Sequence, residues 1–253
     1  MSIDKSVGVV LKKIKWSESS QIVSVYSKDF GKLKLVAKGA LRPKSRFFGG
    51  LELFGIIEFV FYKKEKAELY ILSSSELVRT FPKISSDVKR YGGASAGMEL
   101  LDRLISGEER NLKIYNLVLK FLAGIENFDE DNLESLFWAF ALKLATYLGY
   151  RPKFDFCVGC GKKIDEDFVF FSSERGGLVC KNCTQKDAFY FRLKKTSADW
   201  VNQVLRCDLS RVKKLKLADD EKKIIGNLVL DFLAYHTGRG KELKSLEFLK
   251  RIS

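Results

Sequence analysis

Histidine is almost missing from this chain of 253 residues, which has a single one, His236. A metal centre of several histidines cannot be assembled from one histidine, and a His-based catalytic triad could use no histidine other than His236. The sequence also lacks GxxxxGK[ST] and GxGxxG, the glycine patterns that cradle nucleotide phosphates. An acidic run at 126–134 could bind Mg²⁺ in a metal-dependent nuclease, although such runs are more often solvated loops. We therefore expect a protein that is not an enzyme.

Long apolar runs are absent as well. No stretch of about 18 apolar residues could span a bilayer, and the first 16 residues carry charges where a signal peptide needs an apolar core. We expect a cytosolic protein without a membrane partner. The cytosol keeps thiols reduced. The five cysteines of the chain, four of which form two CxxC pairs, therefore point to metal binding rather than to disulfides.

Acidic residues are outnumbered by basic ones. The 45 lysines and arginines against 32 aspartates and glutamates give a formal net charge of +13. An excess of this size favours approach to a polyanion, and nucleic acid is the leading candidate. A merely solvated basic surface, an anionic membrane and ribosomal RNA are the alternatives.

The first 80 residues predict a small antiparallel barrel. Apolar and β-branched residues gather in short runs that are separated by turns and charged loops. We expect strands at 7–14, 22–27, 32–38, 53–62 and 69–78. Five strands in a segment of this length favour an OB-fold, with an SH3-like barrel as the alternative.

Helical periodicity replaces the strand pattern after Phe81 and Pro82, because proline removes a ladder donor and restricts the residue before it. The sequence thus predicts an α+β, multidomain chain, with an OB-fold nucleic-acid-binding domain at 1–80 and an all-helical domain at 81–253. A module at 153–192 interrupts the helical domain. Helices are expected at 86–105, 111–123, 131–148, from Thr196 or Ser197 to Leu205, at 219–236 and at 243–250.

Four cysteines are spaced as metal ligands. Cys157 and Cys160 form one CxxC pair, and Cys180 and Cys183 form a second pair after 19 intervening residues, which is the spacing of a zinc ribbon or knuckle. Gly159 and Gly161 provide the backbone freedom that a knuckle needs. Four thiolates leave no open coordination position, so we expect one structural Zn²⁺ per chain. Two separate redox or buried CxxC pairs are the alternative.

Basic residues also gather without any acid between Phe30 and Arg46. Alternation along the strand 32–38 predicts three lysines on one outward face, and the loop that follows adds two arginines, a lysine and a hydroxyl suited to phosphate. The predicted DNA-binding residues are Lys32, Lys34, Lys38, Arg42, Lys44, Ser45 and Arg46. Phe47 and Phe48 could stack on bases or belong to the core, and the lysines could instead protect an edge strand from pairing.

Three blocks of residues resemble the RecO family of DNA recombination mediators. The first is the basic loop Ala37-Lys-Gly-Ala-Leu-Arg-Pro-Lys-Ser-Arg-Phe-Phe-Gly-Gly-Leu-Glu-Leu-Phe54. The second is Leu148-Gly-Tyr-Arg-Pro152 leading into both CxxC pairs, with Gly176-Gly-Leu-Val before Cys180. The third comprises Tyr235-His236, Gly238, Lys244-Ser-Leu246 and Phe248-Leu249. The blocks stand in the family's order along the whole chain.

This resemblance implies binding of single- and double-stranded DNA and annealing of complementary strands. It also implies partnership with RecR and with the C-terminal tail of single-strand binding protein, and through them the loading of RecA. Such a protein would be cytoplasmic and associated with the bacterial nucleoid. A zinc-ribbon RNA-binding or transcription factor is the alternative from another class, and it would differ by sequence preference or a need for 2′-hydroxyls.

Overall fold

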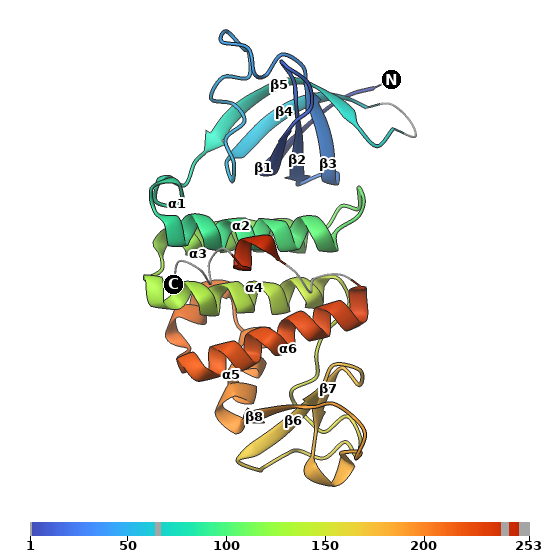
Figure 1. Cartoon of the computed structure of the whole chain (residues 1–253). Coiled ribbons are helices and arrows are strands. Elements are labelled where there is room, and N and C mark those ends of the chain that lie inside the picture. The colour runs from blue at the N-terminus through green and yellow to red at the C-terminus, as the bar shows by residue number, and fades with distance from the viewer. Residues whose placement is uncertain (1, 64–66, 239–242, 248–253) are drawn as a thin grey trace. The chain divides into compact units, whose positions relative to one another are not determined.

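The computed structural model describes residues 2–63, 67–238 and 243–247. The chain forms two compact units, 1–126 and 127–253, and each is described by itself. The fold is α+β: a five-stranded barrel is followed by helices and by a small three-stranded sheet (Figure 1). None of the helices in the described ranges is long and apolar enough to cross a membrane.

The first unit begins with a closed barrel in the strand order β1-β2-β3-β5-β4. Antiparallel pairing of β1 with β4 and a short parallel pairing of β3 with β5 close the barrel. Each of its five strands therefore pairs with a neighbour on both sides. The predicted OB-fold is confirmed. The strands are β1 (Ser2–Lys15), β2 (Gln21–Ser27), β3 (Gly31–Ala37), β4 (Ile56–Lys63) and β5 (Tyr70–Arg79).

Alternation along the strands fills the barrel. On β3, Leu33 and Leu35 are buried inside while Lys34 between them is exposed, because successive side chains point to opposite faces. The long loop after β3 also contributes to the core, since Phe47 and Leu51 are each only 4% exposed and belong to the same cluster. The loop is thereby anchored at its far end.

Three helices complete the first unit: α1 (Pro82–Ser86), α2 (Val88–Leu104) and α3 (Leu112–Asn127). The side chain of Asp87 caps α2 by accepting from the amide of Arg90 at 2.7 Å, and Glu126 accepts from two amides in the first turn of α1. Such caps satisfy amides that have no partner within the helix. The acidic run that begins at Glu126 therefore includes a capping residue.

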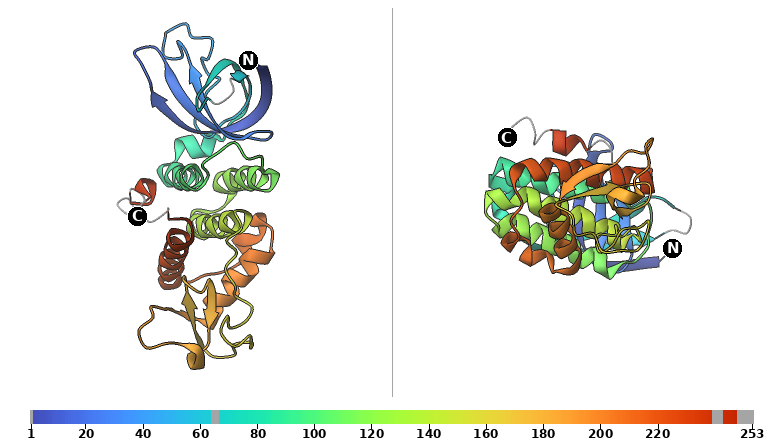
Figure 2. Two further views of the ribbon diagram at one scale, coloured as in Figure 1. Left: turned by 90° about the vertical axis from the view of Figure 1, so that its right-hand side faces the viewer. Right: turned by 90° about the horizontal axis from the view of Figure 1, so that it is seen from below.

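The second unit combines helices with the small sheet. Its helices are α4 (Leu133–Tyr147), α5 (Lys195–Arg206) and α6 (Asp219–Thr237), with the short 3-10 helices η1 (Glu130–Asn132), η2 (Lys181–Cys183) and η3 (Leu209–Lys214). The sheet has the order β7-β6-β8 and consists of β6 (Phe168–Ser172), β7 (Gly177–Val179) and β8 (Phe191–Lys194). Within this unit the sheet lies beside α5 and α6, away from α4 (Figures 1 and 2).

The second unit differs from the sequence-based expectations at several local points. Strand β8 and helix η3 were not predicted, because short segments beside helices carry a weak periodic signal. Ser197 does not cap α5, which begins at Lys195; its buried hydroxyl donates to the Glu221 carboxylate instead. Gly238 ends α6 at a φ of +66°, a left-handed conformation that favours glycine. Of the expected helix 243–250, residues 248–250 lie outside the described residues.

Candidate metal centre and nucleic-acid interface

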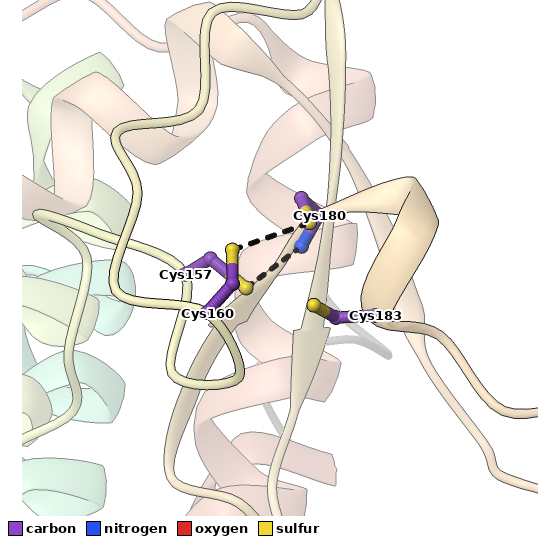
Figure 3. Close-up of side chains that lie close together, drawn as sticks. All are labelled: Cys157, Cys160, Cys180 and Cys183. Atoms are coloured by element: carbon purple, nitrogen blue, oxygen red, sulfur yellow. Dashed lines mark hydrogen bonds between the residues drawn. The ribbon is translucent and has the colours of Figure 1, made fainter.

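The four cysteines of the two CxxC pairs come together in the second unit. Their sulfurs all lie within 4.8 Å of one another, and Cys160 Sγ is 3.9 Å from Cys180 Sγ (Figure 3). Bonds of about 2.3 Å to a tetrahedral metal would place sulfurs about 3.8 Å apart. The set could therefore hold a metal ion.

Hydrogen bonds orient Cys157, which is buried. Its sulfur accepts from the amides of Gly159 and Cys180, each at 3.3 Å. Burial alone would raise the pKa of this thiol, but donation from the backbone amides of Cys180, Cys160 and Gly159 lowers it to about 6. Hydrogen bonds with the neighbouring thiols, Cys180 first among them, raise the pKa of Cys183 to about 12. Without a cation, the four thiols therefore do not all ionise together. A bound cation would lower the pKa of every ligand thiol, because it stabilises all of the thiolates.

Two glycines and one arginine shape the first knuckle. Gly161 has a φ of +72°, a conformation that favours glycine. Gly159 is needed for space, since a Cβ there would lie 3.0 Å from Cys183 Sγ and 2.9 Å from Arg175 Nη2. Arg175 also donates to the Cys183 carbonyl at 3.2 Å. A guanidinium thus lies beside the candidate ligand set and can offset its negative charge.

Backbone pairing joins the first knuckle to β7 within the module, and a side chain of α6 contacts the module from outside. Lys153 pairs with Gly177 in a parallel bridge, and the amide of Val158 donates to the Leu178 carbonyl at 2.8 Å. From α6, His236 Nε2 contacts the Ser173 carbonyl at 2.9 Å. His236, in the last turn of α6, thus has a specific partner in the β6–β7 turn.

The basic residues of β3 do not share one environment. Lys34 and Lys38 are exposed. Lys32 is only 11% exposed in its side chain, because its ammonium group pairs with Asp102 at 2.7 Å and donates to the Ile105 carbonyl at the end of α2. Three exposed ammonium groups were expected on this face, and the structure has two, those of Lys34 and Lys38. The end of α2 covers the third, that of Lys32.

The loop after β3 presents its charges to solvent. Arg42, Lys44 and Arg46 are exposed, and the Ser45 hydroxyl accepts from the Phe47 amide at 3.1 Å. The two phenylalanines separate: Phe47 is in the barrel core and Phe48 is 87% exposed. Of the seven predicted residues, five are exposed, Ser45 is half-buried, and the Lys32 ammonium is engaged by Asp102 and the end of α2.

Strand register adds Lys12, which sequence reasoning missed. Lys12 of β1 pairs with Ser24 of β2, and Ser24 pairs with Lys34 of β3, so the two lysines stand in one row on the outer face. Two inter-strand spacings separate them by about 10 Å. The strand register, which the sequence pattern does not reveal, makes these two lysines neighbours.

A hollow of about 380 Å³ continues this surface beside the β1–β2 turn. Trp16 and Ser17 line it from the turn, and Val36, Lys38 and Arg42 line it from β3 and the basic loop. Trp16 was not singled out from the sequence, where a lone tryptophan at a strand end has no distinguishing pattern.

One catalytic pattern, Gly93-Ala-Ser-Ala-Gly97, also escaped sequence reasoning. It has the GxSxG spacing of a nucleophile elbow, which requires a sharp turn between a strand and a helix. Here it lies in the middle of α2, and a Cβ on Gly97 would lie 2.2 Å from the Phe121 ring of α3. The small residues let two helices approach closely, and no elbow is formed.

Known proteins match the chain over nearly its whole length. A family model described as "Recombination protein O N terminal" matches residues 1–81, and one described as "Recombination protein O C terminal" matches residues 85–247. A DNA repair protein RecO of Caldanaerobacter subterraneus subsp. tengcongensis is 31% identical, with 98% of each chain covered. One of Alkaliphilus metalliredigens is 30% identical, with 98% of this chain and 99% of the relative covered. With both of its parts matched in this way, the chain belongs to the RecO family of DNA repair proteins.

Proposed function

We propose that this protein is a non-enzymatic recombination mediator that binds single- and double-stranded DNA and promotes the annealing of complementary strands. It would act in the cytoplasm, at the bacterial nucleoid. In this proposal residues 1–80 are the nucleic-acid-binding domain, and residues 81–253 form a helical domain with the metal module 153–192 inserted. Membership of a DNA repair family supports the proposal, and so does the net charge of +13.

The observation that carries the DNA-binding part is the group of exposed cations on one side of the barrel. Lys34 and Lys38 extend from β3, and Arg42, Lys44 and Arg46 follow on a loop whose far end is anchored in the core by Phe47. Cations on an anchored loop can follow a phosphate backbone without base-specific contacts. Ser45 adds a hydroxyl to this set, and Lys32, on the same face of β3 as Lys34, holds the strand to the end of α2.

The metal in this proposal is one structural Zn²⁺ bound by Cys157, Cys160, Cys180 and Cys183. Four sulfur ligands at tetrahedral spacing suit zinc and leave no position for a substrate. The metal would hold the knuckles and the three-stranded sheet together, so its contribution is to folding and not to chemistry.

The protein partners in this proposal are inferred from membership of the RecO family. RecR would act with this protein to load RecA onto DNA that is covered by single-strand binding protein. The acidic C-terminal tail of single-strand binding protein would dock on the helical domain, with an apolar residue in a groove and carboxylates near basic side chains.

The salt dependence of single-strand binding tests the DNA contact. Replacing Arg42, Lys44 and Arg46 together by Ala should flatten the slope of log affinity against log salt by roughly two units, since each phosphate contact contributes about 0.7. The loss should be similar for all sequences. Replacing Lys28, Lys83 and Lys113, three exposed lysines elsewhere in the first unit, removes the same charge and serves as the control.

An unchanged slope in the first variant, or an equal change in the control, would remove this surface from the proposal. A strong preference for RNA over DNA of the same sequence would favour an RNA-binding factor instead. Annealing assays with and without single-strand binding protein then measure the mediator activity itself.

A further inference from the structure

The hollow beside the β1–β2 turn has the composition of a binding site for one nucleotide. Its wall includes an indole, that of Trp16, and two cations, those of Lys38 and Arg42. Val36 adds an apolar patch, and three serines of the turn add hydroxyl groups. Among the described residues, none of those that line it is acidic, and Glu18 of the same turn is exposed outside the lining. Its volume of about 380 Å³ is at the small end of ligand sites.

Hydrogen bonds hold the two sides of the hollow together. The amide of Leu41 in the basic loop donates to the Ser19 carbonyl at 2.9 Å, and the amide of Gly39 donates to the Ser20 hydroxyl at 3.3 Å. The turn is itself closed by the Trp16 amide, which donates to the Ser20 carbonyl at 2.9 Å. The indole and the cations are therefore placed together before any ligand arrives, which lowers the ordering cost of binding.

Trp16 is unusual among the three tryptophans of the chain. It is 59% exposed, whereas Trp138 is 6% and Trp200 is 2% exposed. A large aromatic ring left in water beside cations is available for stacking, and every nucleic-acid base offers a π-face. The bases of a duplex are already stacked on one another, so this interaction favours single strands.

We propose that the hollow binds one nucleotide of single-stranded DNA, with its base stacked on the Trp16 indole and its phosphate held by Lys38 and Arg42. The site would deepen the proposed function and rests on it. It adds a stacking contact to the phosphate contacts made by the cations of that surface. The strand would continue from the hollow along the exposed lysines of β3.

Tryptophan fluorescence tests the site directly, because the other two indoles are buried. Titration with oligo(dT) should quench the emission of the wild-type protein. Trp16→Phe should abolish the quenching but keep most of the affinity, since phenylalanine still stacks. Trp16→Ala should weaken binding to oligo(dT) by between about fivefold and a hundredfold and should leave duplex affinity nearly unchanged.

The salt slope separates this inference from the proposed function. Trp16→Ala removes no charge, so its slope should equal that of the wild type even where its affinity falls. Phe189→Ala removes another exposed aromatic ring, 72% exposed in the second unit, and should bind as the wild type does. Circular dichroism should report an intact fold for both variants, because each side chain is mostly in solvent.

Equal affinity of Trp16→Ala and the wild type for oligo(dT) would overturn the inference, as would equal losses for single strands and duplexes. If the variant of Arg42, Lys44 and Arg46 still flattens the slope in that case, the proposed DNA surface stands without the stacking site. If neither variant changes binding, the proposed DNA surface fails as well.

Discussion

Lys32 and Lys34 point to the same side of one strand but have different surroundings. The Lys32 ammonium is enclosed by Asp102 and by carbonyl oxygens at the C-terminus of α2, where the helix dipole also favours a cation. Lys34 is exposed in the row that includes Lys12. One lysine stabilises the first unit, and the other remains available to a ligand.

Alanine at each of these two positions should separate the roles. We expect Lys32→Ala to lower the free energy of unfolding by about 2 kcal/mol, because it leaves Asp102 without its charged partner. Lys34→Ala should change stability little but flatten the salt slope of single-strand binding by about 0.7. Urea unfolding and binding titrations measure the two effects, and a variant that showed both or neither would contradict the assignment.

At the scale of elements, the two CxxC knuckles depend on close approach. The first knuckle passes so near the second that Gly159 has no room for a side chain, whereas a Cβ on Gly161 would meet nothing within 4 Å. Gly161 is required for its backbone conformation instead, because its positive φ is strained for residues with a side chain.

These two glycines should therefore respond differently to alanine. Gly159→Ala should push Cys183 away and speed the release of bound metal to a chelator by tenfold or more, which lowers the barrier to release by about 1.4 kcal/mol. Gly161→Ala should cost about 1 kcal/mol of backbone strain in the fold and change metal release less. A chromogenic zinc indicator follows the release, and the reverse ranking of the two variants would count against this geometry.

At the scale of the whole molecule, all five cysteines lie in the second compact unit. The barrel in the first unit has a core of aliphatic and aromatic side chains and therefore needs no metal. The cysteine module has small strands of three to five residues, which provide little burial on their own.

Metal removal should therefore act on one unit. Elemental analysis should find one zinc per chain, and chelation or Cys180→Ser should abolish amide protection in residues 153–194. Protection in the barrel strands and the salt slope of DNA binding should persist. Hydrogen exchange measured by mass spectrometry resolves the two regions. A folded, fully protected protein without metal would refute a structural zinc.

The strand and helix pattern was largely readable because period-two and period-3.6 burial are local properties. All five barrel strands and the helices of the described chain other than α1 and the 3-10 segments were anticipated, with boundaries that moved by a few residues. The CxxC spacing likewise predicted that four thiols would meet. Strand β8 was not anticipated, since four residues next to a helix carry too little periodicity.

The sequence by itself determined the fold class, the family likeness, the candidate metal ligands and the excess of positive charge. These depend on residue types and short spacings. Tertiary structure alone decided which charges are free, because α2 covers Lys32, and which distant residues are neighbours, because register places Lys12 in a row with Lys34. It also made the hollow at Trp16, whose two sides come from separate segments that are hydrogen-bonded to each other. Contacts between residues far apart in the chain depend on packing, and no local pattern encodes them.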